Sequence, residues 1–341
     1  MTTIKEIAEK LGISTTTVSN VIHGKTGEVS KKTVEKVERL LQEMDYVPNI
    51  SARNLAQNQS KIIGVAMKAR KDKYDNMLAD PFFGELIGAI EARVRYHGYF
   101  MMMYISNDIN EIIEYVSTWN VDGLILIGML HDDYVRVRGK YKKPKVLIDS
   151  YNPREITKYV NVGLEDRKGS YDMTRYLIEC GHRKIAFLTD NLEGVDYYRL
   201  QGFEQAMEEA GIETEEENIV ILNPGEREWE ASLYEVYSLV SEYTAFMCAS
   251  DYYAVQIMLY LQDHGVRIPE DISVTGFDDN LYGKTVRPAL TTIHQDPSKK
   301  GDAAVDTLIK MIDGETISKD MRLPVQLVIR DSVKDISQEI L

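Results

Sequence analysis

The sequence predicts a small all-helical head followed by an α/β body made of two lobes with parallel sheets. In the first 48 residues, apolar side chains recur at helical spacing. From residue 62 onward, short apolar runs typical of buried parallel strands alternate with amphipathic helical segments. This alternation continues for about 280 residues, which is long for one sheet and therefore favours two lobes.

Three helices are expected in the head. The first has Thr3 at its N-cap and a glutamate three residues later, which together form a capping box, and it stops at Gly12. Ser14 caps the second helix, and the third runs from about Ser30 until Pro48 forbids its continuation. Two helices joined by a tight turn and supported by a third form a helix-turn-helix.

The second helix carries a run of threonines at residues 15–17, although Thr is a poor former of helix interiors. Val18, Val21 and Ile22 share the face that packs inward. The polar side chains left near its exposed N-terminal part are Thr15, Thr16, Ser19 and Asn20. Hydroxyls and an Asn amide can bond to base edges or phosphates, whereas a merely solvated helix would use Glu, Lys or Ala. The pattern therefore predicts a DNA recognition helix.

Charge is distributed unevenly along the chain. The formal net charge is −14, yet residues 1–61 contain nine Lys and Arg against seven Asp and Glu. A slightly basic head on an acidic body is compatible with DNA binding by the head. No apolar run approaches the ~20 residues of a membrane span, and the N-terminus lacks a signal-peptide core. We therefore expect a cytoplasmic protein with no membrane partner.

Motifs of the common enzyme classes are missing from the sequence. There is no GxGxxG after a strand, no GxxxxGK[ST] and no GxSxG, and no nucleophile–base pairing is visible. Cys180 and Cys248 lie in no metal or redox spacing, which favours reduced core thiols. The sequence HDD at 131–133 is expected to be a solvated loop rather than a metal site. We expect no enzyme, no cofactor and no metal site.

The head resembles a known family. "TIKEIAEKLGISTTTVSNVIHG" with "VSKKTVEKVERLLQEMDYVPN" is similar to the heads of lac repressor / gal repressor family transcription factors, and "STTTVS" is especially similar to the recognition helix of the purine repressors among them. The resemblance implies that Thr15, Thr16 and Asn20 reach base edges. Asn20 stands where many members have Arg, so the base read there stays open. The residues that the resemblance places on phosphates, at helix N-termini, are Thr3, Ser30 and Thr33.

Residues 49–61, "NISARNLAQNQSK", join the head to the body. Asn49 could cap a short helix, but two helical turns are marginal in water, so a flexible linker is the alternative. The family resemblance implies a hinge helix that orders on DNA, with Leu55 as a wedge in the minor groove. The candidate DNA contacts in this segment are Asn49, Ala52 and Leu55.

The body resembles the two-lobed periplasmic sugar-binding-protein fold found in the same family. The segments that carry the resemblance together include "YLIECGHRKIAFL", "ASDYYAVQ", "IPEDISVTGFDD" and "RPALTTIHQD". It implies that the chain crosses between the lobes near residues 161–163, 289–292 and 321–325. One lobe then comprises about 62–161 and 291–321, and the other about 162–290 and 322–341.

The resemblance also implies that ligand contacts follow strands, at the cleft between the lobes. Asp278 could accept two hydroxyl hydrogens, and Arg199 could donate to two acceptors. Phe82 and Phe83 fall where family members stack an aromatic ring on the ligand, although core packing is an equal alternative. The other candidates are Asp149, Trp229 and Asp251, of which Asp251 could instead be a helix N-cap.

The expected charge of the cleft bears on the ligand. Glu193 lies near the place where the purine repressors have an arginine, so a purine ligand does not follow from the similarity of the head. The four carboxylates expected in the cleft are Glu193, Asp196, Asp251 and Asp278. An acidic cleft disfavours sugar phosphates and suits a neutral sugar or an amine-bearing one.

Together these features predict a DNA-binding transcriptional repressor controlled by a small-molecule effector, a sugar, that binds between the two lobes. Its expected partners are a pseudo-palindromic double-stranded DNA operator and a second copy of the chain. No leucine heptads follow Ile329, which favours a dimer over a tetramer. The alternatives are a solute-binding protein and a repressor that needs a purine or nucleoside corepressor. The head and the missing signal peptide argue against the solute-binding protein.

Overall fold

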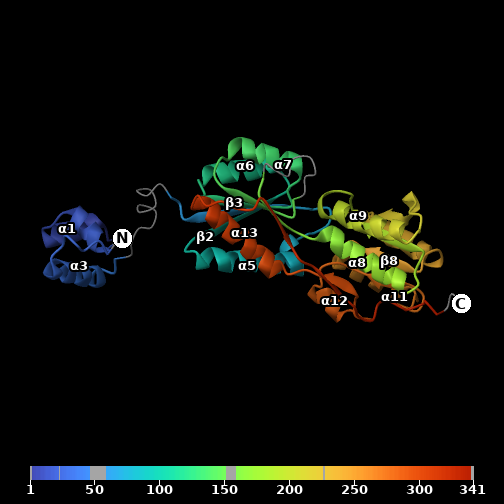
Figure 1. Ribbon diagram of the computed structural model, residues 1–341. Coiled ribbons are helices and arrows are strands. Elements are labelled where there is room, and N and C mark those ends of the chain that lie inside the picture. Colours follow the sequence, from blue (N-terminus) through green and yellow to red (C-terminus); the bar gives the residue numbers. More distant parts are fainter. Residues whose placement is uncertain (1, 23, 47–58, 151–158, 226, 339–341) are drawn as a thin grey trace. The chain divides into compact units, whose positions relative to one another are not determined.

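The computed structural model describes residues 2–22, 24–46, 59–150, 159–225 and 227–338. It forms two compact units, a head (Met1–Ser60) and a body (Lys61–Leu341). Figure 1 shows the helices and strands of each unit, coloured along the chain. In the described parts of both units, no helix is long and apolar enough to cross a membrane.

The described residues of the head form three helices, as the apolar spacing predicts. These helices are α1 (Ile4–Leu11), α2 (Thr15–Ile22) and α3 (Lys31–Glu43). The predicted capping box is present, because Glu6 N donates to Thr3 Oγ1 (3.2 Å) and Thr3 N donates to Glu6 Oε2 (3.0 Å). Gly12 ends α1 in the left-handed region, at φ 63°.

A small apolar core joins the three helices of the head. Ile7 of α1, Val18 of α2 and Val37 of α3 are each completely buried, and they pack in one cluster. Helices of this length are marginal when isolated in water, so the shared core holds them together. Because Val18 and Val21 of α2 are committed to this core, the other faces of α2 are left to the solvent side.

The first lobe of the body is built on a six-stranded sheet with the strand order β11-β5-β4-β3-β1-β2. Neighbouring strands in this sheet are all parallel. The strands are β1 (Ile62–Lys68), β2 (Phe100–Ser106), β3 (Gly123–Ile127), β4 (Lys145–Ile148), β5 (Asn161–Leu164) and β11 (Asp320–Leu323). The helices are α5 (Pro81–Tyr96), α6 (Ile109–Thr118), α7 (His131–Lys140) and α13 (Pro297–Ile312), with the short 3-10 helix η1 (Met77–Ala79).

Helices cover both faces of this sheet. In β1, Ile63, Val65 and Met67 pack with α5 and α13, whereas Ala66 packs with α6 and α7. Figure 1 shows α5 and α13 together on one side of the strands, and α6 with α7 on the other. A strand that is buried on both faces is apolar throughout, which explains why "IIGVAM" is recognisable from the sequence.

The second lobe is built on a four-stranded parallel sheet with the order β7-β6-β8-β9. Its strands are β6 (Ile185–Thr189), β7 (Ile219–Ile221), β8 (Ala245–Cys248) and β9 (Ser273–Thr275). Helices α8 (Asp166–Glu179) and α9 (Gly194–Glu209) cover one face, and α10 (Trp229–Ser238) and α11 (Asp251–Asp263) cover the other. The smaller elements are η3 (Glu216–Asn218), η4 (Leu239–Ser241), α12 (Leu281–Thr285) and the antiparallel pair β10 (Thr292–His294) and β12 (Gln326–Val328).

The chain passes between the lobes three times. It does so after β5 into α8, between β10 and α13, and between β11 and β12. The first two crossings, after Leu164 and after His294, lie a few residues beyond the expected 161–163 and 289–292, whereas the third, after Leu323, falls within the expected 321–325. The reason for the first two is that β5 and β10 complete their pairing with neighbouring strands before the chain leaves each lobe.

Helices α8 and α9 cross closely at Gly202. A Cβ atom at this position would lie 2.8 Å from the Tyr171 backbone nitrogen and would overlap the carbonyl oxygen of Arg167. The absence of a side chain at Gly202 is therefore a condition for the packing of these two helices.

We expect Gly202→Ala to destabilise the body by about 1–3 kcal/mol, because the helices must separate to admit the methyl group. The free energy of unfolding in urea measures this effect. Gly139→Ala in α7 is the matched control, since no atom lies within 4 Å of its Cβ position and its φ is not positive. The control should be neutral or stabilising by about 0.5–1 kcal/mol. Equal stabilities of the two variants would contradict the close crossing.

Candidate functional site

In the head, helix α2 presents polar side chains to the solvent. Thr15 and Thr16 are exposed, and Ser19 and Asn20 are half-buried. Ser14 accepts a hydrogen bond from Thr17 N (3.0 Å), so it caps α2 as expected. The hydroxyls at the start of α2 therefore lie on an accessible surface that hydrogen-bonding groups of another molecule could reach.

The N-termini of α1 and α3 are also accessible. Thr3 and Ser30 are exposed and Thr33 is half-buried. Ser30 Oγ accepts from Thr33 N (3.2 Å) and shares a hydrogen bond with Thr33 Oγ1 (2.8 Å). A helix N-terminus favours anions, because its first N–H groups lack intrahelical acceptors. The assignment of these residues to phosphate contacts stays a prediction. The hinge candidates Asn49, Ala52 and Leu55 lie outside the described residues.

The body contains a cavity of about 460 Å³ that is lined by residues of both lobes. Five of the seven residues predicted at the cleft line it, namely Phe82, Phe83, Asp149, Arg199 and Asp278. The first lobe contributes residues that follow β1, β3 and β4, and the second contributes residues that follow β6, β8 and β9. The cavity thus lies at the carboxyl ends of the strands of both sheets, where ligands of such folds bind.

Trp229 and Asp251 were wrong predictions, because both are used inside the second lobe. The Trp229 ring packs on Tyr253 with 5.7 Å between ring centroids, in the apolar cluster under α11. Asp251 is completely buried and accepts hydrogen bonds from Thr292 Oγ1 (2.5 Å) and Asn280 N (2.9 Å). Asp251 is the first residue of α11, and the N-cap is Ser250. Neither residue lines the cavity.

Arg199 lies at the cavity wall, but its guanidinium is already engaged by the protein. Its Nε donates to Asp166 Oδ1 (2.9 Å), its Nη1 donates to the Ala249 carbonyl (2.6 Å), and it stacks 3.6 Å from the Phe277 ring centroid. Burial would lower the pKa of Arg199, but Asp166 raises it above its usual value. Arg199 therefore stays charged and supports the wall, rather than offering a free fork to a ligand.

Asp149 is also paired inside the protein. Its Oδ2 accepts from the completely buried Lys300 Nζ (2.6 Å), which also donates to Gln295 Oε1 (2.8 Å). Burial raises the pKa of Asp149, and Lys300 opposes this effect. The pairing explains how a carboxylate can be held deep at the end of β4.

Three other carboxyls at the cavity have neutral partners. Gln295 Nε2 donates to Asp278 (2.5 Å), Asn191 Nδ2 donates to Asp196 (2.9 Å), and the backbone N–H of Phe82 donates to Asp80 (2.8 Å). Burial raises the pKa of Asp278 to about 8 and that of Asp196 to about 6. Burial raises the pKa of Asp80 as well. Perturbed carboxyls gathered in one cavity are typical of a functional site.

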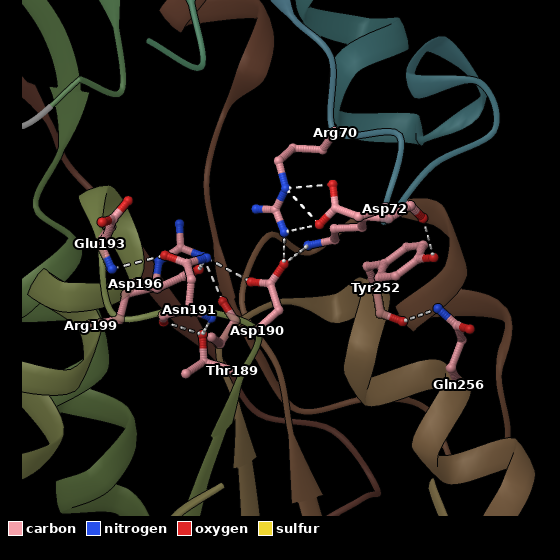
Figure 2. A network of polar contacts seen from close by, with 12 residues as sticks. Arg70, Asp72, Thr189, Asp190, Asn191, Glu193, Asp196, Arg199, Tyr252 and Gln256 are labelled. Atoms are coloured by element: carbon pink, nitrogen blue, oxygen red, sulfur yellow. Dashed lines mark hydrogen bonds and ion pairs between the residues drawn. The ribbon is translucent and has the colours of Figure 1, made fainter. Parts of the chain in front are cut away.

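The sequence reasoning missed a set of charged residues that connects the lobes. Arg70, after β1, donates to Oδ2 of Asp190, after β6, at 2.9 Å. Arg70 also donates three hydrogen bonds to the Asp72 carboxylate. Lys73 lies 3.9 Å from Asp190, and its carbonyl accepts from Tyr252 OH (3.0 Å). Figure 2 shows Arg70 pointing across at Asp190, with Asn191, Asp196 and Arg199 beside them. Their positions just after strands could have indicated them.

The expectation of an acidic cleft is therefore only partly correct. Glu193, Asp196 and Asp278 line the cavity, but so do four cationic side chains. These cations are Lys68, Arg70, Lys73 and Arg199. The cavity also has aromatic lining from Tyr74 and Tyr252, in addition to the two phenylalanines.

The segment HDD at 131–133 is not the solvated loop that was expected. It forms the first turn of α7, and buried Asp133 pairs with Lys68 Nζ at 2.6 Å. Within the described residues, no group of three or more His, Cys, Asp or Glu is arranged to hold a metal ion. Cys180 and Cys248 are buried free thiols, as expected.

Two parts of the chain match described protein domains. Residues 3–49 match the bacterial regulatory proteins of the lacI family, and residues 174–333 match a periplasmic binding protein-like domain. The chain is 34% identical over 350 residues to the HTH-type transcriptional repressor PurR of Vibrio vulnificus, over 99% of this chain and 100% of the relative. It is 31% identical over 354 residues to the PurR repressor of Haemophilus influenzae, over 98% of this chain and 100% of the relative.

Solved structures resemble the whole chain. The lac repressor dimer bound to operator and the anti-inducer ONPF matches with a TM-score of 0.83 and 27% identity, over 98% of this chain and 99% of that chain. The complex of the transcriptional regulator CelR with cellobiose matches with a TM-score of 0.72 and 25% identity, over 97% and 100% of the two chains. These relatives are transcriptional regulators rather than enzymes. The helix-turn-helix head, the two-lobed body and the full-length relatives together show that the chain belongs to the lacI family of bacterial regulatory proteins.

Proposed function

We propose that this protein is a repressor that binds a specific DNA operator and that a small polar ligand, a sugar, controls its DNA affinity from the cavity of the body. One observation carries the proposal: the valines of α2 are buried in the core of the head, while its polar residues remain accessible. This division of faces is the arrangement that a recognition helix needs in the major groove.

Each polar residue of the head has a proposed role. Thr15, Thr16 and Asn20 contact base edges, with Asn20 suited to a bidentate contact with adenine, and Ser19 supports them on the same helix. Ser14, which precedes α2, is proposed to contact the DNA backbone. The residues proposed to hold phosphates at helix N-termini are Thr3, Ser30 and Thr33.

The operator is proposed to be pseudo-palindromic and to be bound by a homodimer in the cytoplasm. A lac repressor structure that matches the whole chain is a dimer on its operator, which supports this assembly. Two-fold symmetry in the protein then requires two half-sites in the DNA. Asn49, Ala52 and Leu55 are proposed to contact the DNA between the half-sites, with Leu55 in the minor groove.

The cavity is proposed to hold a ligand with several hydroxyl groups. Asp278 and Asp196 can accept hydroxyl hydrogens, and the faces of Phe82 and Phe83 can lie against a sugar ring. The match to CelR in complex with cellobiose supports a sugar. A purine is the second candidate, since the most similar relatives reported above are named PurR. Glu193, at the cavity, favours a ligand without negative charge.

The ligand is proposed to control DNA binding by changing how the two lobes of the body pack against each other. Arg70 and Lys73 of the first lobe meet Asp190 of the second, so a ligand that fills the cavity changes the geometry around a cross-lobe ion pair. A coupling of about 1–3 kcal/mol between ligand and DNA is typical of such systems. The sign of the coupling distinguishes an inducer from a corepressor.

Selection of bound sequences from random duplex DNA tests the proposal. We expect the full-length protein to enrich a two-fold symmetric motif with a central pyrimidine–purine step, which kinks easily. Enrichment only in the presence of a sugar or nucleobase mixture would identify a corepressor. The absence of any motif under both conditions would favour a solute-binding protein instead.

Asn20→Ala should weaken operator binding by about 1–3 kcal/mol and relax selectivity at one base pair of each half-site. Fluorescence anisotropy with the selected operator, and with operators changed at single positions, measures both effects. Gln42→Ala is the control, because Gln42 is exposed in the last turn of α3. An equal loss of affinity for all sequences would contradict base reading by Asn20.

Arg70→Met should raise, by about tenfold, the ligand concentration that is needed for a half-maximal change in operator binding. The reason is that the cross-lobe ion pair with Asp190 is lost. The concentration of ligand that gives a half-maximal change in operator binding measures this. Arg267→Met is the control, since Arg267 pairs with Asp271 within one lobe (3.0 Å). An unchanged ligand response in Arg70→Met would argue against the cross-lobe contact as part of the control.

Asp278→Asn should stabilise the ligand-free protein, and more so at pH 7.5 than at pH 5. An Asp in an unfolded chain ionises near pH 4, whereas the folded-state pKa of Asp278 is raised to about 8. Between these values the folded state keeps a proton that the unfolded state has lost, so stability falls as pH rises. Asn cannot ionise and removes this loss. Calorimetric Tm values at both pH values test the expectation, with exposed Asp263→Asn as the control. The same Tm change at both pH values would contradict it.

A further inference from the structure

The cationic side chains that line the cavity are each engaged by a carboxylate of the protein. Lys68 pairs with Asp133, and Arg199 pairs with Asp166. Arg70 and Lys73 share Asp190, and Arg70 also binds Asp72. A phosphate or carboxylate ligand would have to displace one of these pairs. Among the described lining residues, no Lys or Arg is therefore free to receive an anion.

Three carboxyls that line the cavity have no such charged partner in contact, namely Asp80, Asp196 and Asp278. In the described part of the chain, no Lys or Arg forms an ion pair with any of them. Their hydrogen-bond donors are neutral, namely side-chain amides, a backbone N–H and the Tyr74 hydroxyl. Arg199 and Lys73, which are paired with Asp166 and Asp190, lower the pKa values of these carboxyls only from a greater distance. An ionised carboxyl in a buried position needs a nearby positive charge, and otherwise it retains its proton. The cavity thus has carboxyl groups that can accept a cation, and among the described residues no Lys or Arg forms an ion pair with them directly.

Asp80 and Asp278 come from different lobes. Asp80 is the N-cap of α5 in the first lobe, and Asp278 follows β9 in the second. Besides burial, the charge of Asp80 is one of the causes of the raised pKa of Asp278. Burial, followed by these two carboxyls, raises the pKa of Tyr74, so the tyrosine lies near both. A positive charge placed between the two carboxyls would interact with both lobes at once.

An aromatic wall lies beside these carboxyls. The Tyr74 ring contacts Phe83 edge-on at 5.9 Å and Tyr252 at 5.1 Å, and Phe82 lies 5.1 Å from Phe83. Aromatic faces attract ammonium groups. The protein already uses this attraction nearby, because Lys300 Nζ lies 5.0 Å from the Phe82 centroid and Lys73 Nζ lies 4.2 Å from the Tyr253 centroid.

We propose that the ligand of this cavity is an amine-bearing sugar whose ammonium group lies between the carboxylates of Asp80 and Asp278, against the aromatic wall. This inference rests on the proposed function, since it names the ligand class of the same cavity. The ammonium places a positive charge in direct contact with both carboxylates, and the proton that Asp278 holds leaves to solvent. Because the two carboxylates belong to different lobes, the same ammonium draws the lobes together.

Isothermal titration of the full-length protein tests the ligand class. The probes are D-glucosamine and D-galactosamine, their N-acetyl derivatives, the parent sugars and glucose 6-phosphate, all at pH 7. We expect at least one free amine to bind about tenfold or more tightly than both its N-acetyl derivative and its parent sugar. Equal or tighter binding of the neutral or phosphorylated partner overturns the proposal, and so does the failure of both amine probes to bind.

Substitutions test the position of the ammonium group. Asp278→Asn and Asp80→Asn keep the shape of the side chain but cannot ionise, so each should reduce the preference for the amine by about tenfold. Asp263→Asn on the exposed end of α11 is the matched control and should retain the preference. A retained preference in both cavity variants overturns the assignment. Thermal unfolding and operator binding of each variant confirm that it is folded.

The outcomes separate this inference from the proposed function. The selection of operator sequences tests the DNA-binding function of the head, whereas the preference for an amine tests the ligand class of the cavity. A specific operator together with preferential binding of neutral sugars would leave the repressor proposal intact and overturn the amine. A clear amine preference without any operator motif would support the ligand class and overturn the repressor proposal.

Discussion

Parallel strands end at one edge of a sheet, and this constraint places the cavity of the body. Each lobe has a parallel sheet covered by helices on both faces, so its side surfaces are closed and only the strand ends are open. Three chain crossings hold the two open edges against one another. Residues that are distant in sequence, such as Arg70 after β1 and Asp190 after β6, therefore meet in one site.

The charges at this site are arranged for binding rather than for stability. Asp190 is nearly inaccessible, with 1% of its side chain exposed, but Arg70 and Lys73 compensate it. Asp278 and Asp196 have no ion pair with Lys or Arg in the described part of the chain, and burial outweighs the opposing effect of Arg199 and raises the pKa of each carboxyl. Buried carboxyls that are only partly compensated lower the stability of the empty protein, and a ligand that satisfies them recovers that free energy on binding. In the proposed function, the same carboxyls therefore affect both the stability of the protein and its response to the ligand.

The head depends on a different balance. Its helices share only a small core, so nearly every apolar residue of α2 is needed for packing, and the remaining positions are free for polar groups. The three threonines are a poor choice for helix stability and a good choice for an accessible surface with hydroxyls and methyls. This separation of faces lets a short helix be held by its fold and still present a surface to DNA.

The sequence by itself determined the head and the alternation of strands and helices, because capping, apolar periodicity and strand ends are local signals. Five of the cavity residues were expected from the resemblance of the body to the fold of its family. Phe82, Phe83, Asp149 and Asp278 lie just after strands or at a helix start, whereas Arg199 lies in the second turn of α9. Only the tertiary structure decided which charges are compensated. Arg199 was expected to donate to a ligand, but Asp166 engages its guanidinium. Asp251 was expected at the cleft, with a helix N-cap as the alternative, but it accepts hydrogen bonds from Thr292 and Asn280 inside the second lobe. The partners of these two charged groups lie 29 or more positions away along the chain, and they are brought together only when the second lobe folds.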